Sequence, residues 1–587
     1  MDTNNEELIS SIEEANTEIK EDATVVEPAQ ETADKQPAAK KKGIGVGLIL
    51  LIILKLFLRE ALVVVVLGVI FVWPLVNRYY IFPYQTVEDY YDMVDISLTD
   101  EEKLADLEAL YENAFLGNPT CEERAELYGV DYEALYEEYQ TKILETKNEF
   151  EYYCVLVDFV SYVGSGHNRM MYPHFAEVVN SGFQLNMEAL DGSDTAAVYY
   201  TWEQNLKSQY REYWADCGSI RYVDGAYIMH GVMDESIWPK EYWGAKVLSI
   251  DGTDTIDFIV ENPFYNPLVY DDIKNVTYRY SAYFNLTKGT PVVMELQLVD
   301  GSIVELEAFM DPYAECAMYV EYYDAAYVNN SDTDVITDNY ELVECVEDDY
   351  IYLRIYTCMS GEDDERMVEE LEDALTRHDK IIIDLRGNGG GLINYFTRYI
   401  TPYVFEESID IDLPCKIKKN ELSTTWVSDP VTRLMELISF DSSDGYYHFT
   451  DGLWYSGGAD KRNEVYILVD EDTYSSADMF TYAASTLDNV TVIGSHTGGE
   501  GIEGPIFMYS LPNSRLCYAF TPCVNEDTEG SDMLVGITPD VVLTESFEDR
   551  IEYMQLSYEG KNTRAYAVMM QYDDVLLNAI EYVKNAQ

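Results

Sequence analysis

The feature that most constrains the fold is an alternation of short apolar strands and helical segments between about residues 340 and 547. A helix between two strands makes a crossover connection, and such connections bring the strands together in parallel. The order therefore predicts a mixed α/β fold with a largely parallel βαβ sheet. The predicted strands are 350–355, 380–384, 464–469 and 490–493, and the predicted helices are 367–375 and 477–487.

Two smaller modules precede this region. Leucines and tyrosines recur at helical spacing in the earlier part, so we expect a helical module over 81–226. Alternating apolar strands with Asp-Gly turns indicate a β-rich module over 227–310. The α/β region then occupies 311–587 and ends in an amphipathic helix.

An apolar segment near the N-terminus predicts membrane attachment. Residues 1–42 form a polar tail that ends in three lysines, and we expect this tail to be disordered. Residues 43–80 contain two apolar blocks, interrupted by Lys55, Arg59 and Glu60, and the second block is long enough for one spanning helix. A tight hairpin of two short helices is the alternative. Because basic residues gather before the span, the N-terminus is expected in the cytoplasm and the rest of the chain outside it.

Composition excludes several classes of function. Acidic residues number 108 against 38 lysines and arginines, which gives a formal net charge of −70. Such a negative surface repels phosphate backbones, so we expect no nucleic-acid partner. Nine cysteines without CxxC or paired Cys/His spacing indicate neither a disulfide scaffold nor a metal site, and we expect no cofactor.

The first segment with groups suited to catalysis is the strand and loop at 381–391, Ile-Ile-Ile-Asp-Leu-Arg-Gly-Asn-Gly-Gly-Gly. Glycines at the end of a buried strand leave backbone N–H groups free to point into a cavity, as an oxyanion hole requires. The glycines alone are equally compatible with a plain turn. A phosphate-binding loop is not favoured, because no Lys-Ser or Lys-Thr follows them.

The second segment runs from a buried strand through an acidic loop to Ser475 and Ser476, which begin a helix of small residues. A serine at this position is either an ordinary N-cap or a nucleophile. The nucleophile interpretation draws on the positive potential and free N–H groups at a helix N-terminus, where an oxyanion could form. This segment alone leaves both interpretations open.

The third segment, 162–169, places His167 directly after a glycine at the end of the helical module. A base for Ser475 must come from a short list, because the chain has only six histidines. These are His167, His174, His230, His378, His448 and His496. A lone histidine is more often structural or exposed than catalytic.

Together these segments resemble the tail-specific, or C-terminal processing, serine peptidase family, in particular its branch with tricorn protease and the interphotoreceptor retinoid-binding protein repeats. The matching segments follow the family's order and extend over most of the chain beyond residue 130. They are 163–170 for G-D-G-H-T-R-L, 244–252 for the binding-strand region of a PDZ domain, 384–391 for D-x-R-x-N-x-G-G, 475–480 for S-A-S-E-I-F, 492–499 for V-I-G-x-x-T-x-G and 536–540 for G-I-x-P-D.

The resemblance implies a role for each matching residue. Ser475 falls on the nucleophile, and the N–H of Ser476 with that of Gly389 or Gly390 falls on the oxyanion hole. Members with a Ser-Lys dyad have a lysine where this chain has Glu500. A carboxylate with an ordinary pKa of about 4.3 is a poor base for a serine, so that dyad cannot operate here.

The family's other branch uses a histidine base, which the resemblance places at His167. Its orienting acid stands where this chain has Met533, so we expect the adjacent Asp532 to take that role, with Glu529 as the alternative. His496 is the second candidate for the base.

The implied protein is a membrane-anchored, extracytoplasmic serine endopeptidase with a ClpP/crotonase-like core, single-pass in the cell membrane. Its module at 227–310 would be PDZ-like and would bind a polypeptide substrate by its C-terminus. A catalytically impaired peptide-binding or scaffold protein is the alternative, because the lysine is missing, the acid is displaced and Ala477 and Asp478 depart from the family's Ser and Glu. The natural substrate and the oligomeric state are left open.

Overall fold

The computed structural model describes residues 92–586, apart from 174–183, 186–193, 214–216, 232–237, 263, 265, 272, 329–338, 362, 429–444, 502–506 and 526–535. The predicted tail at 1–42 and the predicted membrane anchor at 43–80 lie outside the described residues. Within the described part of the chain, no helix combines the length and the apolar character that a membrane span requires.

Six strands form the central sheet, in the order β12-β13-β14-β17-β18-β22. From β13 to β22 the neighbours pair in parallel, whereas β12 pairs antiparallel with β13. The predicted mixed α/β fold is confirmed. The strands are β12 (Tyr340–Cys345), β13 (Tyr350–Ile355), β14 (Lys380–Asp384), β17 (Glu464–Val469), β18 (Val490–Gly494) and β22 (Val541–Val542).

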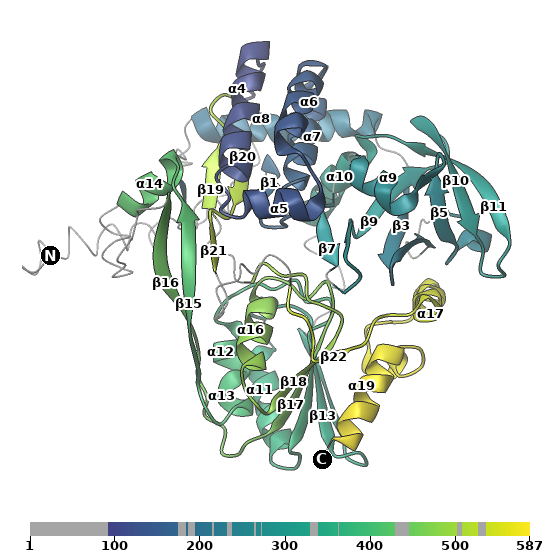
Figure 1. Cartoon of the computed structure of the whole chain (residues 1–587), viewed down its shortest axis with the longest axis vertical. Helices are drawn as coiled ribbons and strands as arrows, with labels where there is room; N and C mark the ends of the chain where they lie inside the picture. The colour runs from purple at the N-terminus through teal and green to yellow at the C-terminus, as the bar shows by residue number, and fades with distance from the viewer. Residues whose placement is uncertain are drawn as a thin grey trace, which may run out of the picture. The chain divides into compact units, whose positions relative to one another are not determined.

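Successive side chains of the central strands enter two separate cores, because they point to opposite faces of the sheet. In β14, Ile381 and Ile383 pack with helices α11, α12, α13 and α16, whereas Ile382 packs with α19 on the other face (Figure 1). All three isoleucines are fully buried, and each contributes about 1.5–3 kcal/mol relative to an exposed position. The helices are α11 (Asp364–Leu375), α12 (Tyr395–Tyr399), α13 (Thr401–Val404), α16 (Ser476–Ser485) and α19 (Asp574–Asn585).

The β-rich module is a seven-stranded sheet in the order β10-β11-β9-β3-β4-β5-β6, and β10 also pairs with β5. Its first strand, β3, precedes the predicted boundary at 227. The elements are β3 (Cys217–Val223), β4 (Ala226–His230), β5 (Lys246–Ile250), β6 (Thr253–Asp254), α9 (Thr255–Glu261), β9 (Ser281–Asn285), β10 (Thr290–Gln297) and β11 (Ile303–Met310). A short hairpin, β7 (Val269–Asp271) and β8 (Val276–Tyr278), lies between α9 and β9 in the chain.

The helical module packs around α7, almost all of whose residues are buried. The ring of Phe159 lies 4.6 Å from that of Phe115 and 4.9 Å from that of Tyr139, centroid to centroid. This packing holds the C-terminal end of α7, from which the His167 segment continues. The helices are α4 (Asp100–Leu110), η3 (Tyr111–Phe115), α5 (Cys121–Tyr128), α6 (Tyr132–Leu144), α7 (Glu149–Ser161), α8 (Asp194–Gln209) and η5 (Tyr210–Glu212).

Two small sheets tie these modules to the core, in the orders β16-β15-β21 and β1-β20-β19-β2. Strand β1 immediately follows the His167 segment and pairs antiparallel with β20, so the segment is anchored to a strand far along the chain. The remaining elements are β1 (Arg169–Met170), β2 (Gln184–Leu185), η6 (Lys240–Tyr242), α10 (Ala314–Val328), β15 (Ile409–Lys418), α14 (Glu421–Ser428), β16 (Tyr446–Tyr455), β19 (Phe507–Ser510), β20 (Cys517–Phe520), β21 (Cys523–Asn525), α17 (Phe547–Tyr558) and α18 (Tyr566–Met569).

Candidate active site

Ser475 stands at the turn that leads from β17 into α16. Its backbone has φ 56° and ψ −123°, and its side chain makes no capping hydrogen bond to the helix. The turn is held on both sides: the Tyr474 N–H donates to the Asn388 carbonyl at 3.0 Å, and the Ser475 N–H donates to the Gly499 carbonyl at 3.1 Å. A sparsely populated conformation of this kind costs on the order of 1–3 kcal/mol and is typical of functional sites. The geometry favours the nucleophile interpretation over the N-cap.

His167 lies directly against this serine. Its Nε2 is 3.1 Å from Ser475 Oγ, although 308 residues separate the two in the chain. The imidazole is buried, with 7% of the residue exposed. The structure thus brings together the two side chains that the proposed chemistry requires to touch.

Gly166 allows this close approach. A Cβ at this position would lie 2.6 Å from Tyr474 Oη. Instead, the Gly166 N–H donates to that hydroxyl at 2.9 Å. The histidine segment is therefore attached to the residue that immediately precedes the nucleophile.

Glu500 is the carboxylate beside the imidazole. Its Oε2 lies 3.4 Å from His167 Nδ1 and accepts the backbone N–H of His167 at 3.1 Å. The Tyr474 hydroxyl donates to the same oxygen, and Arg124 Nη1 lies 3.9 Å from Oε1. Among the described residues Nδ1 has no hydrogen-bond partner, so Glu500 lies close to the ring without forming a hydrogen bond to Nδ1.

The predicted acids, Asp532 and Glu529, lie outside the described residues. The sequence excludes Glu500 only as a base for the serine. The position of Glu500 in the sequence could have predicted its place in the site, since a residue that replaces the dyad lysine lies near the nucleophile. When a histidine supplies the base, a carboxylate there lies near that histidine as well.

The surroundings of His167 keep its ring neutral. Burial, assisted by the positive charges of Arg169 and Arg124, lowers the pKa of His167 to about 3. The neutral ring has a free Nε2 lone pair for the serine proton, but a pKa this low makes it a weak base unless a nearby negative charge stabilises its protonated form. The Glu500 carboxylate opposes the arginines, because a negative charge favours the imidazolium that forms when the proton arrives.

Two of the three predicted oxyanion donors have free N–H groups. The Gly390 N–H donates to Asn388 Oδ1 at 2.9 Å and is therefore occupied. Within the described part of the chain, the N–H groups of Gly389 and Ser476 donate to no acceptor. Gly389 also lies on the wall of the adjoining cavity. Of the two glycines that the resemblance left open, the geometry favours Gly389 as the partner of Ser476.

The other polar residues of the glycine-rich segment hold it in place. Arg386 donates to both oxygens of Asp384, at 2.9 and 2.7 Å. Although burial alone would raise the pKa of Asp384, Arg386 and Arg354 hold it well below its ordinary value. Asn388 Nδ2 donates to the Ile355 carbonyl at 3.0 Å, which ties the loop to the end of β13. These contacts present Gly389 at the carboxyl edge of the sheet.

Asp478, in the first turn of α16, holds the loop that carries Glu500. Its Oδ1 accepts the Thr497 hydroxyl and its Oδ2 accepts the Gly501 N–H at 3.2 Å, on either side of Glu500. The carboxyl is buried, and this burial raises its pKa to about 6. In the sequence, Asp478 is visible only as a departure from the family pattern.

His496, the second candidate for the base, faces other groups. Its Nδ1 lies 2.8 Å from the Thr497 carbonyl, and its Nε2 lies 4.0 Å from Asp271 Oδ1. Among the described residues it makes no hydrogen bond with Ser475. The geometry therefore favours His167.

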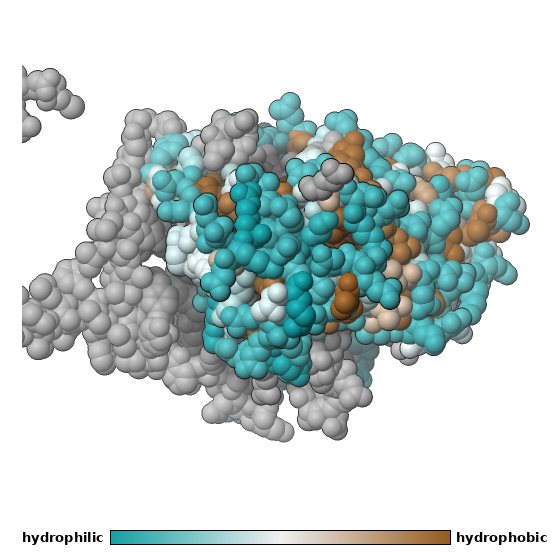
Figure 2. Space-filling view, turned by 90° about the horizontal axis from the view of Figure 1, so that it is seen from below, coloured by the Kyte–Doolittle hydropathy of each residue, from teal (hydrophilic) through white to brown (hydrophobic). Residues whose placement is uncertain are grey.

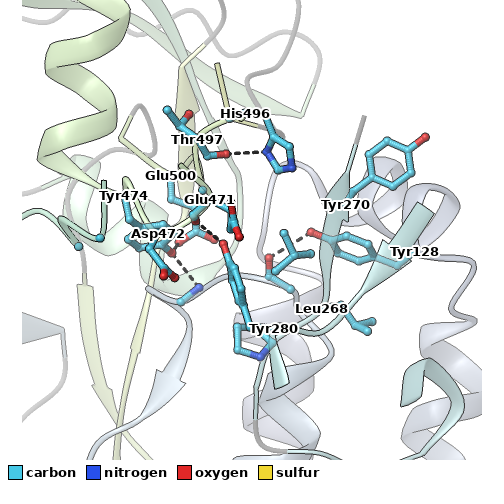
Figure 3. A pocket seen from close by; sticks show the side chains of 18 of the residues that line it. Tyr128, Leu268, Tyr270, Tyr280, Glu471, Asp472, Tyr474, His496, Thr497 and Glu500 are labelled. Atoms are coloured by element: carbon cyan, nitrogen blue, oxygen red, sulfur yellow. Dashed lines mark hydrogen bonds between the residues drawn. The ribbon is translucent and has the colours of Figure 1, made fainter. Parts of the chain in front are cut away.

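A cavity of about 440 Å³ opens beside the catalytic groups. One side carries Glu471, Asp472, Tyr474 and Glu500, and the other carries Tyr128, Leu268 and Tyr270 (Figure 3). Tyr280 lies beside the acidic side, where its hydroxyl donates to the Glu471 carbonyl. The cavity can hold part of an extended peptide next to Ser475. Within the described residues no cluster of His, Cys, Asp and Glu side chains could hold a metal ion.

A family model described as peptidase family S41 matches residues 349–543. No curated protein sequence is significantly similar to the chain. Solved structures with a similar course of the chain include mature CPAF complexed with lactacystin, at 12% identity over 83% of this chain and 100% of that one, with a TM-score of 0.46. The photosystem II D1 C-terminal processing protease matches at 14% identity over 76% and 94%, with a TM-score of 0.34. The tricorn protease matches at 14% identity over 83% and 37%, with a TM-score of 0.29.

Proposed function

The chain belongs to peptidase family S41 through residues 349–543, and from this premise we propose that it is a membrane-anchored, extracytoplasmic endopeptidase that works through Ser475, His167 and Glu500. The family consists of serine peptidases that act on polypeptides. The observation that carries the assignment of residues is the 3.1 Å contact between His167 Nε2 and Ser475 Oγ.

In the proposed reaction, His167 Nε2 takes the proton of the Ser475 hydroxyl as Oγ attacks the carbonyl carbon of the peptide bond. The oxyanion that forms is stabilised by the N–H groups of Gly389 and Ser476. His167 then gives the proton to the leaving amine, and the acyl-enzyme is hydrolysed by water with the same histidine as base. Glu500 stabilises the imidazolium between these proton transfers.

The test is serine-directed labelling combined with peptide cleavage. We expect Ser475→Ala to abolish fluorophosphonate labelling and cleavage of a loosely folded protein. His167→Ala should lose nearly as much, because the two groups act as a unit. Undiminished labelling of the Ser475→Ala variant would show that the nucleophile is another residue.

A second candidate is a peptide-binding protein that retains the fold with little turnover. Nδ1 of His167 has no hydrogen-bond partner within the part of the chain that the structure describes, and this favours the second candidate, because a ring without an oriented acid loses on the order of 10⁴-fold in turnover. The same labelling experiment separates the two: a chain that binds peptides but shows no labelling above the Ser475→Ala background is the binding protein.

The membrane anchor and the location are further parts of the proposal. The apolar segment at 43–80 and the basic residues around its first block support a single span with the N-terminus in the cytoplasm. Protease added outside intact cells should then cut the region after residue 80 and spare the tail. Release of a chain lacking 43–80 from the membrane fraction would agree, and protection of the later region from external protease would contradict the topology.

We also propose that the β-rich module around 227–310 binds the substrate chain end as an added strand, as PDZ domains do. Its antiparallel sheet with the packed helix α9 supports this assignment. Cleavage should then be faster for a peptide with a free C-terminal carboxylate than for its amide, and equal rates would argue against binding by the chain end.

A further inference from the structure

Three large apolar side chains lie exposed beside the candidate active site. Met359 is 56% exposed, Leu392 is 42% exposed and Ile393 is 65% exposed. We call these three residues the glycine-loop patch. On the face of the molecule that Figure 2 shows, hydrophobic residues are scattered among hydrophilic ones. Single exposed apolar residues are normal on protein surfaces, whereas groups of them mark interaction sites.

The three side chains come from two segments that run side by side. Cys358 and Gly391 form a parallel bridge, and the Leu392 N–H donates to the Cys358 carbonyl at 2.9 Å. On the other segment, Asn339 Nδ2 donates to the Met359 carbonyl at 3.0 Å. The patch is therefore held by backbone hydrogen bonds and has a defined position.

This position is next to the nucleophile. The patch directly follows Gly390, where a Cβ would lie 2.7 Å from Ser475 Cβ. The cavity, in contrast, is lined by Gly387 and Gly389 and does not extend to the patch. At about 3.3–3.6 Å per extended residue, the four steps from Gly389 to Ile393 span at most about 13–14 Å, within reach of about four substrate residues.

Resting on the proposed function, we propose that the glycine-loop patch binds an extended apolar segment of the substrate, on the side of the scissile bond away from the cavity. A polypeptide cut at Ser475 must continue beyond the cavity, and these exposed side chains lie within a few residues' length of the nucleophile. Apolar segments are buried in folded proteins. The substrate class is therefore an unfolded or loosely folded polypeptide with apolar residues within about four positions of the cleavage site.

Binding to the full chain with Ser475→Ala tests this without any need for turnover. The probes are fluorescent peptides of equal length that share one central sequence. One set is extended on its N-terminal side and the other on its C-terminal side. In each set the extension is either four leucine or valine residues or four serine or glycine residues. We expect the apolar extension on one of the two sides to bind about tenfold more tightly than the polar extension on the same side. The ratio of these two affinities is the quantity compared between variants. Ile393→Asp should bring that ratio close to one, whereas Ile393→Phe should retain it.

Val346→Asp is the matched control. Val346 is 72% exposed in the turn between β12 and β13, at the opposite end of the parallel strands from the glycine loop. This variant should keep the wild-type ratio. An Ile393→Asp chain with the wild-type ratio overturns the proposal, as does a wild-type ratio of one for both extensions.

Light scattering on the same variants tests whether a second copy of the chain, instead of the substrate, binds to the patch. If Ile393→Asp converts an oligomer into a monomer and leaves the peptide ratio unchanged, the patch is an interface between copies of the chain and the proposal is wrong. Failure of the proposed function would look different, because fluorophosphonate labelling and cleavage would then be absent while peptide binding still reported on the patch.

Discussion

At the scale of single residues, Glu500 is the group that distinguishes this site from a Ser-His pair without an acid. It lies 3.4 Å from His167 Nδ1 and is itself held by Tyr474 and Arg124. We expect Glu500→Gln to lower kcat by roughly 10²–10⁴-fold, because the neutral amide no longer stabilises the imidazolium. Steady-state cleavage of a peptide by the purified chain measures this effect.

Asp532→Asn is the comparison for that experiment. If Glu500 is the orienting acid, the asparagine variant should keep kcat within a few-fold of wild type. A large loss with Asp532→Asn and none with Glu500→Gln would return the role to the acid that the family pattern indicates.

The pH dependence of turnover is also decided at one residue. Because burial, Arg169 and Arg124 lower the pKa of His167 to about 3, the ring is already neutral well below pH 6.5. Activity that depends on the neutral base is lost only as the pH falls through this low pKa. We expect the acid limb of the kcat/KM profile well below pH 6.5, and a limb at or above that value would contradict the role of the buried ring.

At the scale of elements, α16 positions two loops at once. Its N-terminus presents Ser475, and Asp478 in its first turn accepts hydrogen bonds from Thr497 and Gly501 on either side of Glu500. Because the two donors face different oxygens of Asp478, the variant Asp478→Asn turns an NH2 group toward one of them, loses that hydrogen bond and should displace the Glu500 loop.

We therefore expect Asp478→Asn to reduce kcat by about tenfold or more, with KM changed less, because the chemistry depends on geometry held to a fraction of an ångström. Thermal unfolding of the same variant is the control for general damage. Unchanged kcat, or a loss of activity fully explained by unfolding, would show that Asp478 has no positioning role.

At the scale of the whole molecule, several buried carboxyl groups make stability depend on pH. Burial raises the pKa of four of them, to about 6 for Asp158, Asp478 and Asp549 and to about 7 for Asp470. Each of these groups binds a proton in the folded chain at a pH where the unfolded chain, with a pKa near 3.8, does not. Their contribution to stability is complete below pH 3.8 and is lost as the pH rises through 6 to 7.

The buried histidines act in the opposite direction at lower pH. The pKa of His167 and that of His230 fall from 6.5 to about 3, mainly through burial, so the unfolded chain takes up protons first below pH 6.5. Between pH 8 and pH 6 the carboxyl groups dominate, and lowering the pH also reduces the self-repulsion of a chain with a net charge of −70. We expect the free energy of unfolding to rise from pH 8 to pH 6, as measured by urea unfolding.

Added salt gives an independent check on how much the repulsion between negative charges lowers the free energy of unfolding. Ionic strength of about 0.15 M or more screens exposed charges beyond about 8 Å, so it should raise the midpoint of unfolding at pH 8 more than at pH 6. Stability that falls steadily from pH 8 to pH 6 would contradict the role of the buried carboxyl groups.

The local pattern of the sequence determined the elements of this protein. Short, nearly continuous apolar runs identified β13, β14 and β17 with their observed bounds, since a strand buried on both faces is apolar along most of its length. The glycine-rich loop and the serine at the start of a helix could also be predicted from the sequence. Free N–H groups at the end of a strand or the start of a helix depend only on neighbouring residues. Resemblance to a family then selected His167 from six histidines.

Tertiary structure alone decided which side chains meet. The approach of Glu500 to His167 and the hydrogen bonds of Asp478 on either side of Glu500 depend on loops from separate strands that converge at one edge of the sheet. No periodicity along the chain encodes these contacts, because they arise between segments far apart in sequence. A carboxylate that is a poor base for a serine becomes the partner of an imidazole only when folding places the imidazole beside it.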